Sequence, residues 1–265
     1  MLRLHPQSRL ESHTAMTMKL TLLDRIANKM ASLRSVRQIV SQLQAPVASI
    51  SFDDIPHSAA RIGAPVLEAV GLRGTFYVCG DHSGQTFEGR PQHELSDLIA
   101  LNDAGHEIAC HTFGHPNVVN MNDNARQVDA QANADFMTSQ LRASAPSSFA
   151  YPFGRVSGAA KAFYSQRFMT CRGVYAGINA GKMDFSELRA VGIESRSHDM
   201  GRVKALIDEA KAKTGWLIFY THDVDDNPTA HGCRPKDLED VIGALSDANI
   251  QTLPVRDAAQ LVLAT

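Results

Sequence analysis

Short apolar runs alternate with helix-periodic stretches from residue 46 to the end of the chain. The apolar runs have the length of buried strands, and the stretches between them repeat apolar residues every three or four positions. This alternation predicts an α/β fold with a parallel sheet, either closed into a barrel or doubly wound. The expected strands are residues 47–52, 74–79, 106–110, 148–151, 168–172, 188–193, 216–221 and 250–253, and the expected helices lie near 58–70, 92–104, 122–143, 156–166, 201–213, 235–247 and 256–263.

Residues 1–45 have a different pattern. They carry seven Lys and Arg residues against two acidic ones, and residues 20–43 place apolar side chains at helical spacing. We therefore expect a basic, helical N-terminal extension over 1–45, followed by one domain over 46–265. Such amphipathic helices are expected to pack on the main domain or on a second copy of the chain, as a homo-oligomer contact. A membrane-surface anchor is the alternative.

Composition excludes several classes of protein. The 265 residues are 44% hydrophobic and 20% charged with a formal net charge of −2, so no overall charge favours a nucleic-acid partner. The longest apolar runs, such as 216–220, are far shorter than a transmembrane segment, and residues 2–18 lack the apolar core of a signal peptide. The four cysteines are widely spaced, which indicates reduced thiols and a cytoplasmic location.

Polar side chains with catalytic potential follow four of the expected strands. Asp53 and Asp54 end the first strand, His111 ends the third, Tyr151–Gly154 ends the fourth, and His222–Asp223 ends the seventh. In a parallel α/β barrel the active site collects at the carboxyl ends of the strands, so all four groups are expected on one face.

The residue types in these groups are those of a hydrolytic metal site. His111 and His115 are four residues apart, and two imidazoles with one carboxylate are a common ligand set for a catalytic zinc with water in the open position. The second carboxylate of the Asp53–Asp54 pair then suits a general base, although sequence alone does not say which Asp has which role. His222 suits the general acid that protonates a leaving amine.

Four ordered motifs together resemble a known family. Ser51–Asp54, His111–His115, Tyr151–Gly154 and Thr221–Asp223 occur in the order and at the spacing of the NodB-homology polysaccharide deacetylases, carbohydrate esterase family 4. The resemblance covers about residues 46–260. It implies a distorted (β/α)7 barrel that binds one divalent metal ion, usually zinc, and removes N- or O-acetyl groups from a sugar.

The resemblance also implies a role for each residue. Asp53 would be the general base, Asp54, His111 and His115 the metal ligands, His222 the general acid, and the backbone N–H of Phe153 an oxyanion donor. Beside these residues, Tyr151, Pro152, Gly154 and Asp223 are expected to contact an acetylated glycan or oligosaccharide.

The chain departs from the family pattern in two places. The third motif usually carries an arginine that pairs with the base, but this position is Ala150. Arg189, at the start of the sixth expected strand, is our candidate replacement. The fourth motif, which usually supports the acidic imidazole, is not recognisable, and Asp184 and Asp199 are equal candidates for that support.

Three functions are therefore compared. The leading one is a metal-dependent deacetylase of a polysaccharide or oligosaccharide. The altered motifs keep open a metal-dependent hydrolase of small non-sugar amides or ureides on the same barrel. The third is a non-catalytic glycan-binding domain that retains the metal. The presence of all the proton-transfer residues counts against it, because a binding domain does not need them. A cytoplasmic enzyme is expected, with a peripheral membrane location if the basic N-terminus binds lipid.

Overall fold

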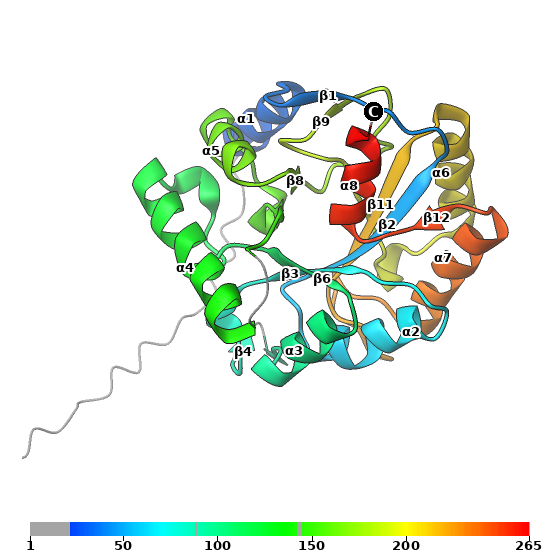
Figure 1. Ribbon diagram of the computed structural model, residues 1–265, viewed down its shortest axis with the longest axis horizontal. Coiled ribbons are helices and arrows are strands. Elements are labelled where there is room, and N and C mark those ends of the chain that lie inside the picture. The colour runs from blue at the N-terminus through cyan, green and yellow to red at the C-terminus, as the bar shows by residue number, and fades with distance from the viewer. Residues whose placement is uncertain (1–21, 88, 142–144, 265) are drawn as a thin grey trace, which may run out of the picture.

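A curled parallel sheet surrounded by helices forms the core of the molecule in the computed structural model (Figure 1). The structure describes residues 22–87, 89–141 and 145–264. The strand order is β10-β11-β2-β3-β6-β7-β8, with β12 also paired to β2. All these pairings are parallel, as the distorted (β/α)7 barrel requires. The strands are β2 (Val47–Asp53), β3 (Thr75–Val78), β6 (Glu107–Cys110), β7 (Ser148–Ala150), β8 (Thr170–Arg172), β10 (Val191–Gly192), β11 (Trp216–Thr221) and β12 (Gln251–Thr252).

The central strands of the curled sheet are buried on both faces. Every residue of β2 is buried, and the Phe52 ring stacks on the Phe76 ring of β3 at 4.6 Å between centroids. Between β8 and β10 the ladder reduces to one bridge, Arg172 with Leu188, so the barrel is incomplete there. The covering helices are α2 (Ala64–Glu68), α3 (Leu95–Asp103), α4 (Asp123–Leu141), α5 (Gly158–Arg167), α6 (Met200–Lys213), α7 (Pro235–Asp247) and α8 (Val255–Leu263).

The alternating pattern therefore predicted the barrel well. Each expected strand and helix after residue 46 is present, and the largest change is the sixth strand, where 188–193 shortens to Val191–Gly192. Pro65 lies in the first turn of α2, where a proline costs no helical hydrogen bond. The β4–β5 hairpin (Thr86–Phe87 with Arg90–Pro91) and β9 (Lys182–Asp184) were not predicted.

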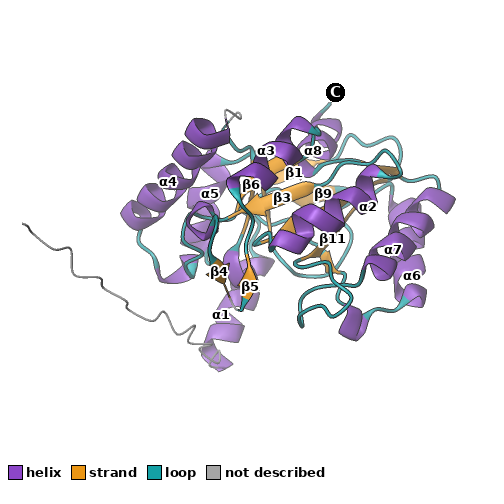
Figure 2. Ribbon diagram, turned by 90° about the horizontal axis from the view of Figure 1, so that it is seen from below, coloured by secondary structure: helices purple, strands orange, loops and turns teal. Residues whose placement is uncertain are grey.

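The N-terminal prediction covers residues 1–45, of which 1–21 lie outside the described residues, and over 22–45 it is partly wrong. Helix α1 (Leu22–Leu33) is present, but the chain then forms β1 (Gln38–Val40), antiparallel to β9, where helix was expected. Arg37 fixes this change of structure, because its guanidinium donates to the carbonyls of Ser165, Phe168 and Met169. Figure 2 shows α1 and the β4–β5 hairpin on the same side of the molecule, opposite α8.

The four cysteines are buried and free, as expected. Burial raises the pKa of the Cys110 thiol to about 12 and that of the Cys233 thiol to about 12. These thiols therefore act as small apolar side chains. In the described part of the chain, no helix is long and apolar enough to cross a membrane.

Candidate active site

Polar side chains from four strand ends meet in one cavity of about 380 Å³ at the carboxyl end of the sheet. It is lined by Asp53, Asp54, His111, His115, Tyr151, Phe153, Gly154, Val174, Glu194, Tyr220, His222 and His231. At least one residue from each of the four expected strand-end groups therefore lines this cavity.

Backbone conformation separates the two adjacent carboxylates. Asp53 is the last residue of β2 and stays in the sheet, whereas Asp54 has a positive φ of 60°. Thr112, His115 and Phe153 also have positive φ values, which are rare for residues other than glycine and typical of functional sites. The strained turns direct Asp54 and the two imidazoles toward one point.

Asp54, His111 and His115 form a compact group of ligand atoms. The Asp54 Oδ1 atom lies 3.4 Å from His111 Nε2 and 3.3 Å from His115 Nε2. His111 Nδ1 lies 2.9 Å from the Ala150 carbonyl, which can only accept, so the proton belongs on Nδ1 and the lone pair of Nε2 faces Asp54. Burial lowers the pKa of His111 to about 4, and burial also lowers that of His115, so both imidazoles are neutral at pH 7.

These residues fit a divalent metal ion. Asp54 Oδ1 and His115 Nδ1 are buried without a hydrogen-bond partner. One ligand atom from each of Asp54, His111 and His115 lies within 4.8 Å of the others. A carboxylate with two neutral imidazoles is a donor set that zinc accepts.

The loop that carries both histidines is held from outside the cavity. Asp129 of α4 accepts hydrogen bonds from the backbone N–H groups of Phe113 (2.9 Å) and Gly114 (3.2 Å). No sequence motif pointed to Asp129, because its partners are backbone amides that any residue could supply.

Asp53 pairs with an arginine that the sequence interpretation missed. The guanidinium of Arg172, the last residue of β8, binds the Asp53 carboxylate, and both side chains are almost completely buried. The Arg172 guanidinium also lies between the rings of Tyr77 and Tyr220, at 4.9 and 5.0 Å from their centroids. This contact supplies the pairing that Ala150 cannot make.

Arg189 was therefore the wrong candidate for this pairing. Its guanidinium donates to the Ala176 carbonyl at 3.2 Å, and it lines a different cavity, beside α1. The physical reason is position within the strand. Arg189 was placed at the start of its expected strand, which is the end of the barrel away from the active site, whereas Arg172 ends its strand on the correct face.

His222 follows β11 and reaches toward the metal-ligand group. Its Nε2 lies 3.9 Å from Asp54 Oδ2, and its Nδ1 lies 3.3 Å from the His231 carbonyl. Neither expected acidic partner supports it, because Asp184 binds Lys161 and Asp199 caps helix α6. The His231 carbonyl therefore takes the place of the unrecognised fourth motif.

The expected substrate-contacting residues divide into two groups. Gly154 and Tyr151 line the cavity, and a Cβ at Gly154 would lie 2.2 Å from Val174, so only glycine fits that turn. Pro152 is buried outside the lining. Asp223 is also buried outside the lining, where its carboxylate accepts from the Thr229 N–H at 2.8 Å and from the Thr229 hydroxyl. The prediction that Asp223 contacts substrate is wrong, because its side chain holds the loop over 224–233.

Comparison with known proteins finds a family model that matches part of this chain. Residues 41–170 match the family model described as polysaccharide deacetylase, a range that contains the first three of the four motifs. This match confirms the resemblance and the predicted enzyme type. No curated protein sequence matches the chain.

Solved structures show the same fold at low sequence identity. A Mycobacterium smegmatis protein aligns with a TM-score of 0.62 at 13% identity, over 87% of this chain and 96% of that one. A family 4 acetyl xylan esterase from Clostridium thermocellum, in complex with a cobalt ion, gives 0.58 at 17% identity over 81% and 91%. Peptidoglycan deacetylase PdaC from Bacillus subtilis gives 0.53 at 18% identity over 83% and 93%. At these identities the likeness shows the barrel fold.

Proposed function

We propose that this chain, a polysaccharide deacetylase by its match over residues 41–170, is a metal-dependent hydrolase that removes acetyl groups from an amino sugar in a glycan. The observation that carries the proposal is the separation of Asp53 from Asp54. One carboxylate is paired with Arg172, and the other lies between two neutral imidazoles in the same cavity. These two environments suit a base and a metal ligand.

Asp54, His111 and His115 would hold the metal ion. When bound, a divalent metal ion supplies Lewis-acid activation of water and polarisation of the acetyl carbonyl. The family 4 esterase of Clostridium thermocellum was solved with cobalt, which supports a divalent ion, and the ligand set favours zinc.

Asp53 would take the proton of the attacking water. Arg172 holds this carboxylate in position through a buried ion pair, and the rings of Tyr77 and Tyr220 hold the guanidinium in turn. A base that is fixed by its neighbours pays little orientational entropy when the reaction begins.

His222 would donate the proton to the leaving nitrogen. Its Nδ1 is oriented by the His231 carbonyl, which leaves Nε2 directed toward the cavity. The backbone N–H of Phe153 would donate to the oxyanion. Phe153 lies in a turn that only a glycine at position 154 allows.

The substrate class follows from the cavity and from the relatives. A volume of about 380 Å³ is of the size of a small-molecule site, and Phe153, Val174 and Tyr220 give it apolar walls beside its polar end. The named relatives are an acetyl xylan esterase and a peptidoglycan deacetylase. We propose the N-acetyl group as the main substrate because an imidazole acid is positioned for a leaving amine, and the O-acetyl group as the second.

Acetate release from chitooligosaccharides and from acetylated xylan tests this function. We expect release that a chelator abolishes and that zinc restores. The matched variants are His111→Ala, which should be inactive, and Arg189→Met, which should match the wild-type protein. Hydrolysis of small amides without acetate release from any sugar would favour the amidohydrolase function, and metal binding with no hydrolysis would favour a glycan-binding domain.

A further inference from the structure

In the described part of helix α1, residues 26–33, polar side chains face the barrel and large apolar side chains face solvent. Asn28 and Ser32 contact the domain, whereas Ile26, Met30 and Leu33 are exposed by 51%, 63% and 70%. The spacing of these three apolar residues places them on one side of the helix. An ordinary surface helix has the opposite arrangement, with its apolar side buried.

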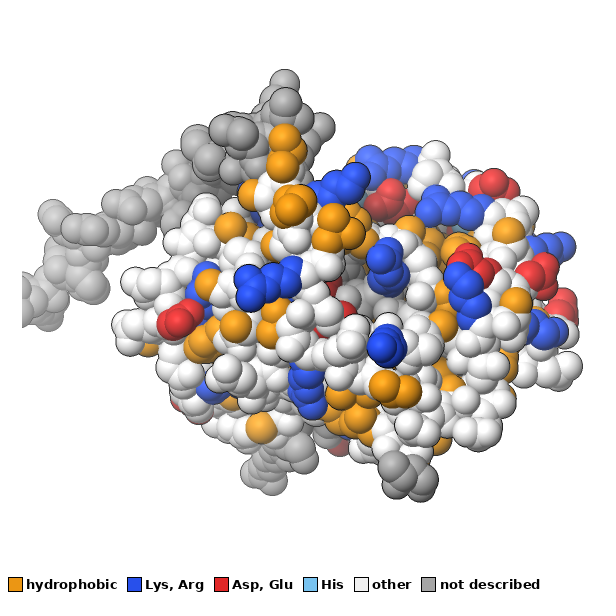
Figure 3. Space-filling view, turned by 90° about the horizontal axis from the view of Figure 1, so that it is seen from above, with side chains coloured by type: hydrophobic (Ala, Val, Ile, Leu, Met, Phe, Trp, Pro, Cys, Tyr) orange, Lys and Arg blue, Asp and Glu red, His pale blue; other side chains and the backbone are white. Residues whose placement is uncertain are grey.

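The apolar surface continues beyond the helix. Val36 and Val40 are exposed by 39% and 58%, so five of the twelve exposed large hydrophobic residues of the described chain lie within residues 26–40. Isolated exposed hydrophobic residues are normal, but several within one short segment indicate an interaction surface. We call this group the α1 patch, and it consists of Ile26, Met30, Leu33, Val36 and Val40. Figure 3 shows hydrophobic side chains beside Lys and Arg side chains on the side of the molecule at the top of Figure 1.

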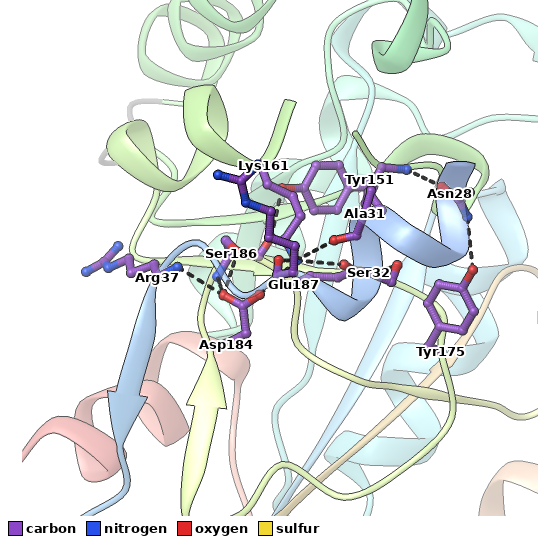
Figure 4. A network of polar contacts seen from close by, with 12 residues as sticks. Asn28, Ala31, Ser32, Arg37, Tyr151, Lys161, Tyr175, Asp184, Ser186 and Glu187 are labelled. Carbon is purple, nitrogen blue, oxygen red and sulfur yellow. Dashed lines mark hydrogen bonds and ion pairs between the residues drawn. The ribbon is translucent and has the colours of Figure 1, made fainter. Parts of the chain in front are cut away.

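Polar contacts fix α1 in this orientation. Ser32 donates to Glu187 at 2.6 Å, and buried Lys161 donates to the Arg34 carbonyl at 2.7 Å, just beyond the end of the helix. Figure 4 shows the contact of Ser32 with Glu187, and Lys161 close to both. Rotating the helix to bury the α1 patch would break them, so the outward apolar side is the arrangement that the neighbouring side chains support.

Charge favours one occupant of the α1 patch. Residues 1–45 carry seven Lys and Arg residues against two acidic residues, and the side chains of Lys29 and Arg34 are exposed beside the patch. Two copies joined through the same patch would bring two basic segments together, which electrostatic repulsion opposes. An anionic surface would instead be attracted.

We infer that α1 docks the protein on an anionic lipid bilayer. The apolar side of the helix would enter the boundary between head groups and acyl chains, and Lys29 and Arg34 would lie over anionic head groups. Docking would also place the cavity near the bilayer. The Asn28 side chain accepts from the Val156 N–H at 2.6 Å, three residues after Phe153 at the cavity wall.

Vesicle co-sedimentation of the full chain tests this inference. We expect the protein to bind vesicles of phosphatidylcholine with about a third phosphatidylglycerol, to bind phosphatidylcholine alone at least about tenfold more weakly, and to be released by salt. Met30→Ser combined with Leu33→Ser should weaken binding to the anionic vesicles at least about tenfold. Val128→Ser is the matched control, because Val128 is 62% exposed on α4 and should leave binding unchanged.

Three outcomes would overturn the inference. They are no binding of the wild-type protein to anionic vesicles, equal binding by the wild-type and Met30/Leu33 proteins, and a dimer in light scattering that the double substitution converts to monomer without any vesicle binding. Thermal unfolding shows whether the variants are folded. Acetate release from a soluble chitooligosaccharide is measured in parallel, because it depends on the proposed function and not on docking.

Discussion

Two buried groups of charged and polar side chains lie in this barrel, and they are compensated to different degrees. The first contains Lys161, which is fully buried and has Asp184 Oδ2 at 2.8 Å and Glu187 Oε2 at 3.1 Å. The same ammonium donates to the Arg34 carbonyl at 2.7 Å and the Ala31 carbonyl at 3.3 Å, so its charge and its protons are satisfied within the protein (Figure 4).

The second group is Asp54 with His111 and His115, and it lacks a cation of its own. Its only charged member at pH 7 is the Asp54 carboxylate, because burial keeps the imidazoles of His111 and His115 neutral. Burying a charge without an opposite charge is unfavourable, so a group of this kind is expected to bind a cation from solution. The difference separates a structural group from a ligand-binding group without reference to any relative.

The largest effect is expected at the uncompensated group. His111→Ala should abolish metal binding and lower kcat/KM by at least about 10³-fold, because metal activation contributes several kcal/mol to the barrier. The unfolding free energy of the metal-free protein should fall by about 1–3 kcal/mol, since the substitution leaves the buried Ala150 carbonyl without its donor. Metal content, acetate release and urea unfolding in chelator measure the three quantities.

His57→Ala is the control for this substitution, because His57 lies outside the cavity lining, beside Asp97. Full metal occupancy in the His111→Ala protein would contradict the ligand assignment.

Substitution in the Lys161 group should instead lower stability and leave metal binding unchanged. Lys161→Met leaves two acidic side chains near each other without their cation, and it leaves the Ala31 and Arg34 carbonyls without their donor. We therefore expect the unfolding free energy to fall by about 3–5 kcal/mol. Metal content per folded molecule should not change. Urea unfolding measures the loss, and amide hydrogen exchange in α1 shows whether the helix opens first.

Lys213→Met is the matched control for Lys161. Lys213 pairs with Glu209 at 2.6 Å on the exposed side of α6, and such surface pairs contribute about 0.5 kcal/mol or less. If the two lysine substitutions destabilised the protein equally, burial and compensation would not be the distinction between the groups.

The Asp53–Arg172 pair combines both properties, since it is compensated internally and also faces the cavity. Arg172→Met should lower kcat about 10- to 100-fold with little change in KM and in metal content, because Asp53 loses its fixed orientation. Arg189→Met should change none of these quantities. Steady-state kinetics with metal analysis compares the two, and a larger effect at Arg189 would restore the original candidate.

The success and failure of the sequence interpretation have physical causes. The strand-end rule located Asp53, Asp54, His111 and His222, because alternating apolar runs define where strands stop. Applied consistently, the same rule would have selected Arg172, which ends the expected strand 168–172. The missing family arginine at Ala150 directed attention instead to a residue at the opposite end of a strand.

Other features could not be predicted from residue types. His222 is supported by the backbone carbonyl of His231. This carbonyl lies next to His222 because Asp223 binds Thr229 and shapes the loop between them. Helix periodicity identified α1, but it assigns the apolar side to the interior by default, and only the positions of Lys161 and Glu187 show that the polar side packs inward.

The smallest expected effect tests whether α1 links the two regions. Asn28 accepts from the Val156 N–H at 2.6 Å and donates to the Tyr175 hydroxyl at 3.2 Å, so it joins α1 to the segment that follows Phe153. Asn28→Ala removes both contacts and should lower kcat about three- to tenfold, since each such hydrogen bond contributes about 1 kcal/mol and Phe153 must hold its N–H in place. KM and metal content should stay constant.

Asn28→Asp keeps the acceptor for Val156 and should recover most of the rate, whereas Tyr175→Phe removes only the second contact and should have the smaller effect. A merely structural contact would lower the unfolding free energy in Asn28→Ala without changing kcat at a temperature where the protein is folded. That result would show that α1 packs on the barrel without positioning the Phe153 turn.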